Sequence, residues 1–152
     1  MKAYLAGAIE HAPDLGKKWR NEIGLFLEKE LAHNYYNPLK EEEKYLTQEE
    51  METFRGLKVT NINRYKTILR KLINGDINEL IKSIDYIICL WDEYTEKGGG
   101  TYGELTVAFE HNIPVYMVTE KLNAEISGWV LGCTTEIFTN FSDLKSYLRE
   151  KY

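Results

Sequence analysis

Residues 85–105 read DYIICLWDEYTEKGGGTYGEL, and this stretch decides the fold class. The apolar run over 85–91 predicts a buried strand, which ends at Asp92. Three glycines follow, and Glu104 then stands in the first turn of a predicted helix over 102–111. Glycine lets a ligand approach the backbone closely. The stretch therefore predicts a strand–loop–helix unit with a carboxylate on either side of a ligand-binding loop.

The rest of the chain alternates between predicted strands and helices. Further strands are predicted over about 2–6, 33–38, 114–119 and 135–138. Further helices are predicted from about Asp14 to Leu31, over 62–84 with a break at Asn74-Gly75, and from Ser142 or Asp143 onward. Strands separated by helices form parallel sheets, so we predict an α/β fold with about five parallel strands and helices on both faces. Neither a repeat nor a linker is visible, so residues 1–152 are predicted to form a single domain.

The segment from Lys40 to Lys58 interrupts this alternation. It is rich in Glu and Lys and has few apolar residues. We interpret about 40–60 as a helical excursion on the surface, which is either a flap over a site or a solvated insertion without a role.

Composition limits the class of protein. The chain has 152 residues, of which 43% are hydrophobic, so it can bury a core. A net charge of -5 argues against a general nucleic-acid binder. The longest apolar runs are of strand length, and the start of the chain is too quickly polar for a signal peptide, so we expect a cytoplasmic protein that does not enter membranes. The two cysteines, Cys89 and Cys133, have no metal-binding spacing.

The carboxyl ends of the predicted strands should meet at one edge of the sheet. Ligands of open parallel sheets bind beyond this edge. It would gather the loop 7–10, Asp92 with Glu93, and the segment 98–104. The sequence therefore predicts an acidic rim at the position where a ligand binds.

Each carboxylate of this rim also fits a purely structural role. Thr101 and Glu104 match the S/T-x-x-E capping box, which stabilises a helix by about 1 kcal/mol. Asp92 suits the start of a turn, and Asp76 suits the cap of a helix that begins after Gly75. In the functional interpretation Glu104 is a nucleophile, kept ionised by the positive end of its helix.

The segment 98–103 also contains the pattern G-x-G-x-x-G of dinucleotide-binding proteins. The residues 92–97 separate these glycines from the strand, and acidic side chains surround them. We therefore disfavour binding of a dinucleotide. The chain has no G-K-[ST] sequence of a P-loop.

In their order along the chain, several segments resemble the nucleoside 2-deoxyribosyltransferase family, which includes a related branch of nucleoside-monophosphate N-glycosidases. The matching segments are Tyr4–Ile9, Tyr36–Pro38, Asp76 with Ser83–Asp85, Leu90–Glu93, Gly100–Leu105 with Ala108, and Ile113–Val115. The resemblance implies a flavodoxin-like, Rossmann-like fold and action on the N-glycosidic bond of a nucleoside or nucleotide, with a free base as partner. It implies no metal or organic cofactor, and it implies a homo-oligomer.

The resemblance also implies roles for individual residues. Glu104 would attack C1′ of the deoxyribose, Asp92 would take part in proton transfer to the departing base, and Asp76 would help to hold the base. A covalent glycosyl-enzyme would form and then be released by a second base or by water. The other substrate-binding residues would be Tyr4, Gly7, Ala8, Ile9, Glu10, Gly100 and Thr101.

Three functions stay open at this point. We predict a transferase that exchanges the bases of 2′-deoxynucleosides, because Ala8 and Glu10 replace the Ser and Arg that hold phosphate in the hydrolase branch. A nucleoside 5′-monophosphate N-glycosidase is the alternative, with Lys17 and Arg20 as candidate phosphate ligands. A non-catalytic nucleotide-sensing module is the third, because a fold alone does not prove activity.

Thr106 stands where the family usually has a glycine. The segment Gly128–Gly132 is our guess for a region that completes the site of a neighbouring subunit.

Overall fold

The computed structural model describes all 152 residues, and its centre is a single sheet of five parallel strands. The strands run in the order β2-β1-β3-β4-β5, and every neighbouring pair is parallel. They are β1 (Lys2–Ala6), β2 (Asn34–Tyr36), β3 (Tyr86–Leu90), β4 (Val115–Val118) and β5 (Glu136–Phe138). The predicted α/β fold with its five strands is thus confirmed.

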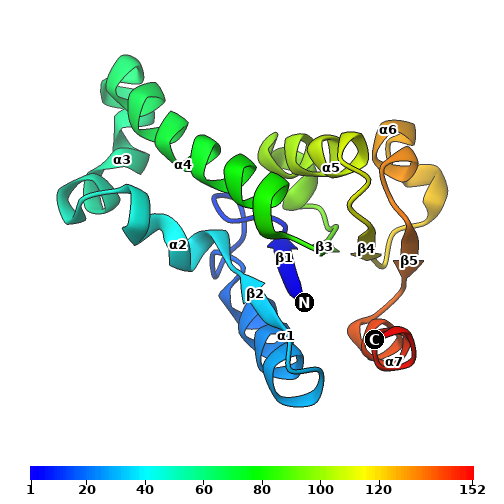
Figure 1. Cartoon of the computed structure of the whole chain (residues 1–152). Helices are drawn as coiled ribbons and strands as arrows, with labels where there is room; N and C mark the ends of the chain where they lie inside the picture. The colour runs from blue at the N-terminus through cyan, green and yellow to red at the C-terminus, as the bar shows by residue number, and fades with distance from the viewer.

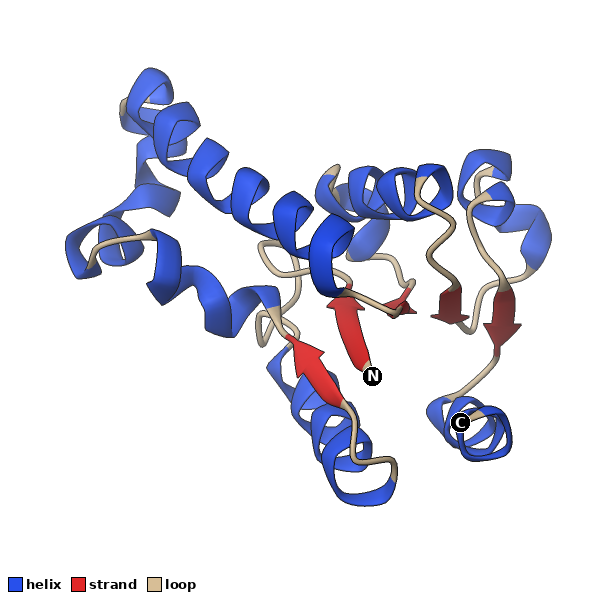
Figure 2. Ribbon diagram, in the orientation of Figure 1, coloured by secondary structure: helices blue, strands red, loops and turns tan.

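Helices cover both faces of the sheet (Figures 1 and 2). One face carries α1 (Lys17–Glu30) and α7 (Phe141–Lys151). The other face carries α4 (Ile62–Ser83), α5 (Gly100–Glu110) and α6 (Gly128–Gly132). Successive side chains of a strand point to opposite faces of the sheet. In β3, Ile88 therefore packs in the core under α1 and α7, and Ile87 packs in the core under α4, α5 and α6. Burial on both faces explains why β3 is apolar at every position.

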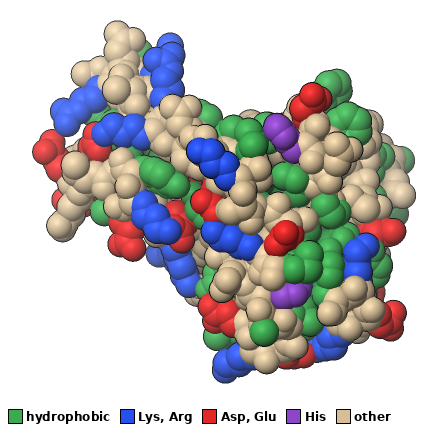
Figure 3. Space-filling model, in the orientation of Figure 1, with side chains coloured by type: hydrophobic (Ala, Val, Ile, Leu, Met, Phe, Trp, Pro, Cys, Tyr) green, Lys and Arg blue, Asp and Glu red, His purple; other side chains and the backbone are tan.

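A helical arm extends from one side of the sheet (Figure 1). It consists of α2 (Pro38–Tyr45), α3 (Gln48–Thr60) and the half of α4 that packs on them. Asn37 caps α2, and Thr47 with Glu50 forms a capping box for α3. The arm has a small core of its own, made by Leu46, Phe54, Tyr65 and Ile68. The predicted excursion is therefore helical, and its surface carries scattered Lys and Arg side chains (Figure 3).

The predicted break in the helix at Asn74-Gly75 is wrong. Helix α4 runs without interruption through its 22 residues, so Asp76 lies inside the helix and caps nothing. Gly75 has a packing role, because a Cβ atom at this position would lie 2.4 Å from the ring of Tyr45. The absence of a side chain at Gly75 therefore allows the Tyr45 ring of α2 to pack directly against α4.

The start of α1 also differs from the prediction. The helix begins at Lys17, and its cap is Gly16 in the left-handed conformation, with φ of 69°. Asp14 accepts hydrogen bonds from the backbone N–H groups of Gly16 and Lys18, so it orders the turn before the helix. No helix combines the length and the apolar composition needed to cross a membrane.

Candidate active site

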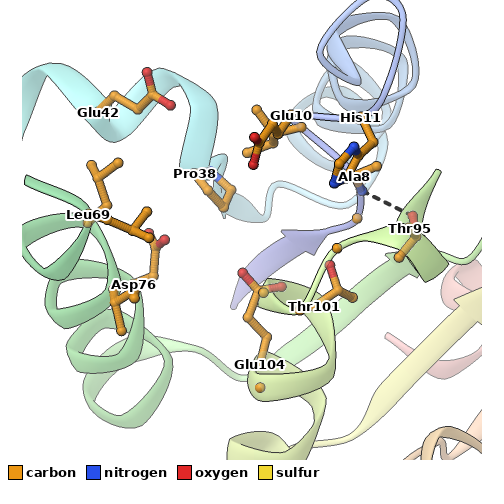
Figure 4. A pocket seen from close by; sticks show the side chains of 18 of the residues that line it. Ala8, Glu10, His11, Pro38, Glu42, Leu69, Asp76, Thr95, Thr101 and Glu104 are labelled. Atoms are coloured by element: carbon orange, nitrogen blue, oxygen red, sulfur yellow. Dashed lines mark hydrogen bonds between the residues drawn. The ribbon is translucent and has the colours of Figure 1, made fainter. Parts of the chain in front are cut away.

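A cavity of about 540 Å³ lies where β1 and β3 end, between the arm and the start of α5 (Figure 4). Its floor comes from the loop after β1 and from the glycine loop with the first turns of α5, and its far wall comes from α2, α3 and α4. Its lining includes Gly7–His11, Gly98–Gly100, Thr101, Glu104, Phe54, Arg55, Leu69, Leu72, Ile73 and Asp76.

Glu104 is a half-buried residue whose carboxyl group is buried at the bottom of this cavity. The hydroxyl of Tyr4, a fully buried residue of β1, donates a hydrogen bond of 2.7 Å to Oε1 of Glu104. The second oxygen, Oε2, is also buried and has no hydrogen-bond partner. A buried carboxylate oxygen without a partner is costly for stability, and such groups are often functional.

Asp76 faces the same cavity from α4, and a second tyrosine holds it. The Tyr36 hydroxyl of β2 donates a hydrogen bond of 2.9 Å to Oδ1 of Asp76. Tyr4 and Tyr36 are direct partners in the register of β1 and β2, and their rings stack with centroids 5.2 Å apart. The strand register thus fixes two tyrosines side by side, and each tyrosine positions one carboxyl group.

The environments of the two carboxyl groups change their pKa values. Burial is the main cause that raises the pKa of Glu104, and the Tyr4 hydrogen bond, the charge of Arg20 and the nearby Thr101 side chain act in the opposite direction. The pKa of Asp76 is raised to about 7, first by burial and then by the negative charge of Glu104. Two interacting carboxyl groups of this kind titrate as a pair, as in enzymes that need an acid and a base at neutral pH.

The capping-box interpretation of Thr101 and Glu104 is wrong. The helix begins at Gly100 with Gly99 as its cap, and no side chain makes the capping hydrogen bond. Glu104 is therefore the fifth residue of the helix and faces the interior, where burial raises its pKa, and the helix end that we expected to lower this pKa is not among the causes of the shift. Gly100 and Thr101, predicted to bind substrate, do line the cavity.

Asp92 does not join the other predicted site residues. Its Oδ1 accepts hydrogen bonds from the backbone N–H groups of Tyr94 and Thr95 and from the Thr95 hydroxyl. It is absent from the lining of the cavity, so the structure favours the turn interpretation. Thr95 in turn accepts a hydrogen bond of 3.0 Å from the Ala8 backbone N–H. Asp92 thereby contributes to the shape of the cavity through Thr95.

Arg20 organises the loop after β1. Its guanidinium is fully buried and donates five hydrogen bonds of 2.8 to 3.3 Å to backbone carbonyls, which belong to Leu5, Gly7, Ala8, Leu15 and Gly16. Gly7 has a φ of 151°, which favours glycine. The guanidinium is therefore committed to the loop, and neither Arg20 nor the exposed Lys17 lines the cavity as a phosphate ligand.

Thr106 also has a structural explanation. Its hydroxyl donates a hydrogen bond of 2.7 Å to the Tyr102 carbonyl and accepts one of 2.9 Å from the indole N–H of Trp129. The residue thus fixes α6 to the outer side of α5. The Gly128–Gly132 segment is this helix α6, and its Trp129 side chain is 65% exposed.

The structure gathers most of the predicted site and adds residues that we did not predict. Of the predicted residues, Gly7, Ala8, Ile9, Glu10, Asp76, Gly100, Thr101 and Glu104 line the cavity, and Tyr4 contacts Glu104. We missed the role of Tyr36 and the apolar wall from the arm. The feature that could have indicated a role of Tyr36 in the site is its position at the end of the strand that pairs with β1. No group of three or more His, Cys, Asp or Glu side chains is arranged to hold a metal ion.

Comparisons with known proteins show what the chain is similar to. No family model and no curated protein matches it. A conserved protein from Enterococcus faecalis V583 has a similar structure, with a TM-score of 0.67 and 13% identity over 100% of this chain and 99% of the other. The CMP N-glycosidase BcmB from Clostridium botulinum is similar over 100% of both chains, with a TM-score of 0.58 and 13% identity. At these identities the likeness shows a shared α/β fold.

Proposed function

We propose that the protein cleaves the N-glycosidic bond of 2′-deoxynucleosides and transfers the deoxyribosyl group to a second base. One observation carries the proposal. Glu104 has one oxygen held by Tyr4 and one buried oxygen without a partner, at the bottom of a cavity large enough for a nucleoside. The similarity of the fold to that of a CMP N-glycosidase supports the class of reaction.

In the first half-reaction Glu104 is the nucleophile. Its free carboxylate oxygen forms a bond to C1′ as the bond between C1′ and the base nitrogen breaks. The electron pair of the broken bond goes to the base, which takes a proton from Asp76. Asp76 suits this role because its raised pKa keeps it protonated close to neutral pH. This assignment moves the proton-transfer role from Asp92, which holds a turn, to Asp76.

In the second half-reaction a new base attacks C1′ of the glycosyl–Glu104 ester. Its nitrogen forms the new bond, the ester bond breaks, and the proton of the incoming base goes to Asp76. Two displacements at C1′ retain the configuration of the sugar. The apolar wall formed by Leu69, Leu72 and Ile73 favours capture by a flat base over capture by water.

The charge of the cavity supports an uncharged nucleoside as the substrate. Four carboxyl groups line it, from Glu10, Glu42, Asp76 and Glu104, and the cationic Arg55 is already paired with Glu42 at 2.6 Å. A nucleoside 5′-monophosphate N-glycosidase is the second candidate, because a CMP N-glycosidase has a similar fold. Arg55 would then have to leave Glu42 to bind the phosphate.

The experiment is chromatography of the purified protein with a 2′-deoxynucleoside, with and without a second free base, and with the 5′-monophosphate. A new deoxynucleoside that forms only with the second base would establish the transferase. Free base and deoxyribose 5-phosphate from the monophosphate alone would establish the hydrolase. No turnover in any mixture would contradict both and would favour a nucleotide-sensing module. The Glu104→Gln variant is the control for every reaction.

A further inference from the structure

One face of α4 extends the cavity well beyond Asp76. Tyr65, Leu69, Leu72 and Asp76 follow one another at helical spacing, and all of them line the cavity. Asp76 follows Tyr65 by 11 positions, which correspond to about 16.5 Å along the helix axis at 1.5 Å per residue. The cavity is therefore longer than a deoxyribose with an unsubstituted base, and we call the part beyond Asp76 the arm chamber.

The arm chamber is lined by apolar side chains from two helices. Phe54 of α3 stacks on Tyr65 with ring centroids 6.3 Å apart and closes the far end. Along the side, Leu69 and Leu72 are half-buried and Ile73 is 48% exposed. Apolar groups that line a cavity gain free energy when a ligand removes them from water.

The polar groups of the arm chamber neutralise one another. Arg55 donates a hydrogen bond of 2.6 Å to Glu42, and both residues line the cavity. Figure 4 shows Glu42 and Leu69 on the side of the cavity where Asp76 lies, with Glu104 facing them from α5. A ligand group that occupies the arm chamber is therefore apolar and uncharged, and it lies beyond Asp76 when the sugar lies at Glu104.

Building on the proposed function, we infer that the arm chamber binds an alkyl or aryl substituent of the base, on the edge remote from the sugar. The preferred substrates are then nucleosides whose base carries such an apolar group. The sugar end of the cavity would be shared by all substrates, whereas the arm chamber would distinguish the substituted from the unsubstituted base.

The first test compares N6-benzyl-2′-deoxyadenosine with 2′-deoxyadenosine as substrates. We expect kcat/KM to be at least about tenfold higher for the benzyl compound, because the chamber buries its ring. The Leu69→Trp variant fills the chamber, so the preference should fall to about unity. Ile81→Trp is the matched control, because Ile81 lies on the same helix, is 45% exposed and does not line the cavity. Turnover without any preference for the benzyl compound in the unmodified protein would overturn the inference and leave the proposed function intact.

The second test does not need turnover. Calorimetry with the Glu104→Gln variant measures the binding of the free bases adenine and N6-benzyladenine. Tighter binding of N6-benzyladenine, by about tenfold or more and lost on adding Leu69→Trp, would support the arm chamber even if no nucleoside is cleaved. Equal binding of the two bases would overturn it. The binding measurement thereby tests the arm chamber separately from the proposed cleavage of nucleosides.

Discussion

The two ends of the cavity are built in different ways. At the sheet end, Tyr4 and Tyr36 are almost fully buried, stack on each other, and each holds one carboxyl group. At the arm end, the lining is apolar and the core behind it has only four buried residues. A surface ion pair of 2.6 Å, between Lys58 of α3 and Glu10 of the loop after β1, connects the arm to the body.

Under the proposed function, the sheet end of the cavity would carry out the chemistry and the arm end would recognise the base. Strands in a shared register hold side chains precisely, and proton transfer and nucleophilic attack need such positions. We expect the helical arm, with its small core, to have a lower local stability than the sheet and to adapt to different ligands. We therefore expect changes at the sheet end to reduce turnover, and changes in the arm to alter binding and local stability.

The largest expected effect follows Glu104→Gln. Turnover should fall by at least about 10³-fold, because the amide cannot serve as nucleophile. Thermal unfolding should occur at the same or a higher temperature, since the variant removes a buried carboxylate whose Oε2 has no partner. Glu110→Gln at the exposed end of α5 is the matched control. A near-normal rate of turnover in Glu104→Gln would refute the role of Glu104 as the nucleophile.

Asp76→Asn should reduce turnover by about 10²-fold or more, because a general acid typically contributes this amount. In the unmodified protein the rate should fall as the pH rises through about 7, where Asp76 loses its proton. This alkaline fall should disappear in the variant. An unchanged alkaline limb in the pH profile would assign the proton transfer to another group.

The same variant changes the stability of the fold. The pKa of Asp76 is about 7 when folded, above its ordinary value near 4 in an unfolded chain, so the folded state binds more protons between these pH values. The contribution of Asp76 to stability is present at low pH and is lost as the pH rises through about 7. Thermal unfolding of Asp76→Asn between pH 4 and pH 8 should show a smaller decline than that of the unmodified protein.

Phe54→Ala tests the independence of the arm. Phe54 is 4% exposed, and truncation of a buried Phe typically costs about 3–5 kcal/mol. Hydrogen exchange should show loss of amide protection in α3 and in the part of α4 packed on it, while β1 and β3 stay protected. Loss of protection throughout the protein would show that the arm and the sheet unfold together and that the arm has no separate local stability.

The smallest effect is expected for Lys58→Ala. Both partners of the Lys58–Glu10 pair are about half exposed, and such pairs contribute little. We expect kcat/KM to change by less than about threefold, and the difference should vanish in 1 M salt because salt screens the pair. Lys66→Ala, at an exposed position of α4, is the control. A tenfold change in kcat/KM would instead show that this ion pair holds the arm in the position that the reaction needs.

The fold could be predicted from the sequence because its signals are local. The apolar run of β3 and the helical spacing of α1 follow from burial of one or both faces. Local signals failed where tertiary packing decides. Gly75 looks like a break in the helix, but it accommodates the Tyr45 ring from another helix. Asp76 suited a helix cap and, by the family resemblance, a role in holding the base, and it lies inside the helix and lines the cavity.

The site was predicted only in part, for a similar reason. Topology gathers residues that follow the strands, so Glu104 and the loop after β1 could be predicted to meet. It does not say which way a side chain turns, and Asp92 turns into its own loop. The pairing of Tyr4 with Tyr36 depends on the register of two strands far apart in the sequence, which no local pattern gives.

The electrostatic coupling of the two carboxyl groups would also set the timing of the proposed reaction. A glycosyl–Glu104 ester carries no charge, so its formation removes the negative charge that helps to raise the pKa of Asp76. The pKa of Asp76 then falls, and the group that gave its proton to the first base stays ionised until the next base arrives. Release of the sugar restores the charge on Glu104 and draws a proton back to Asp76. Asp76 would thus be protonated when Glu104 is free and ionised when Glu104 carries the sugar, and each turnover would return both groups to their starting states.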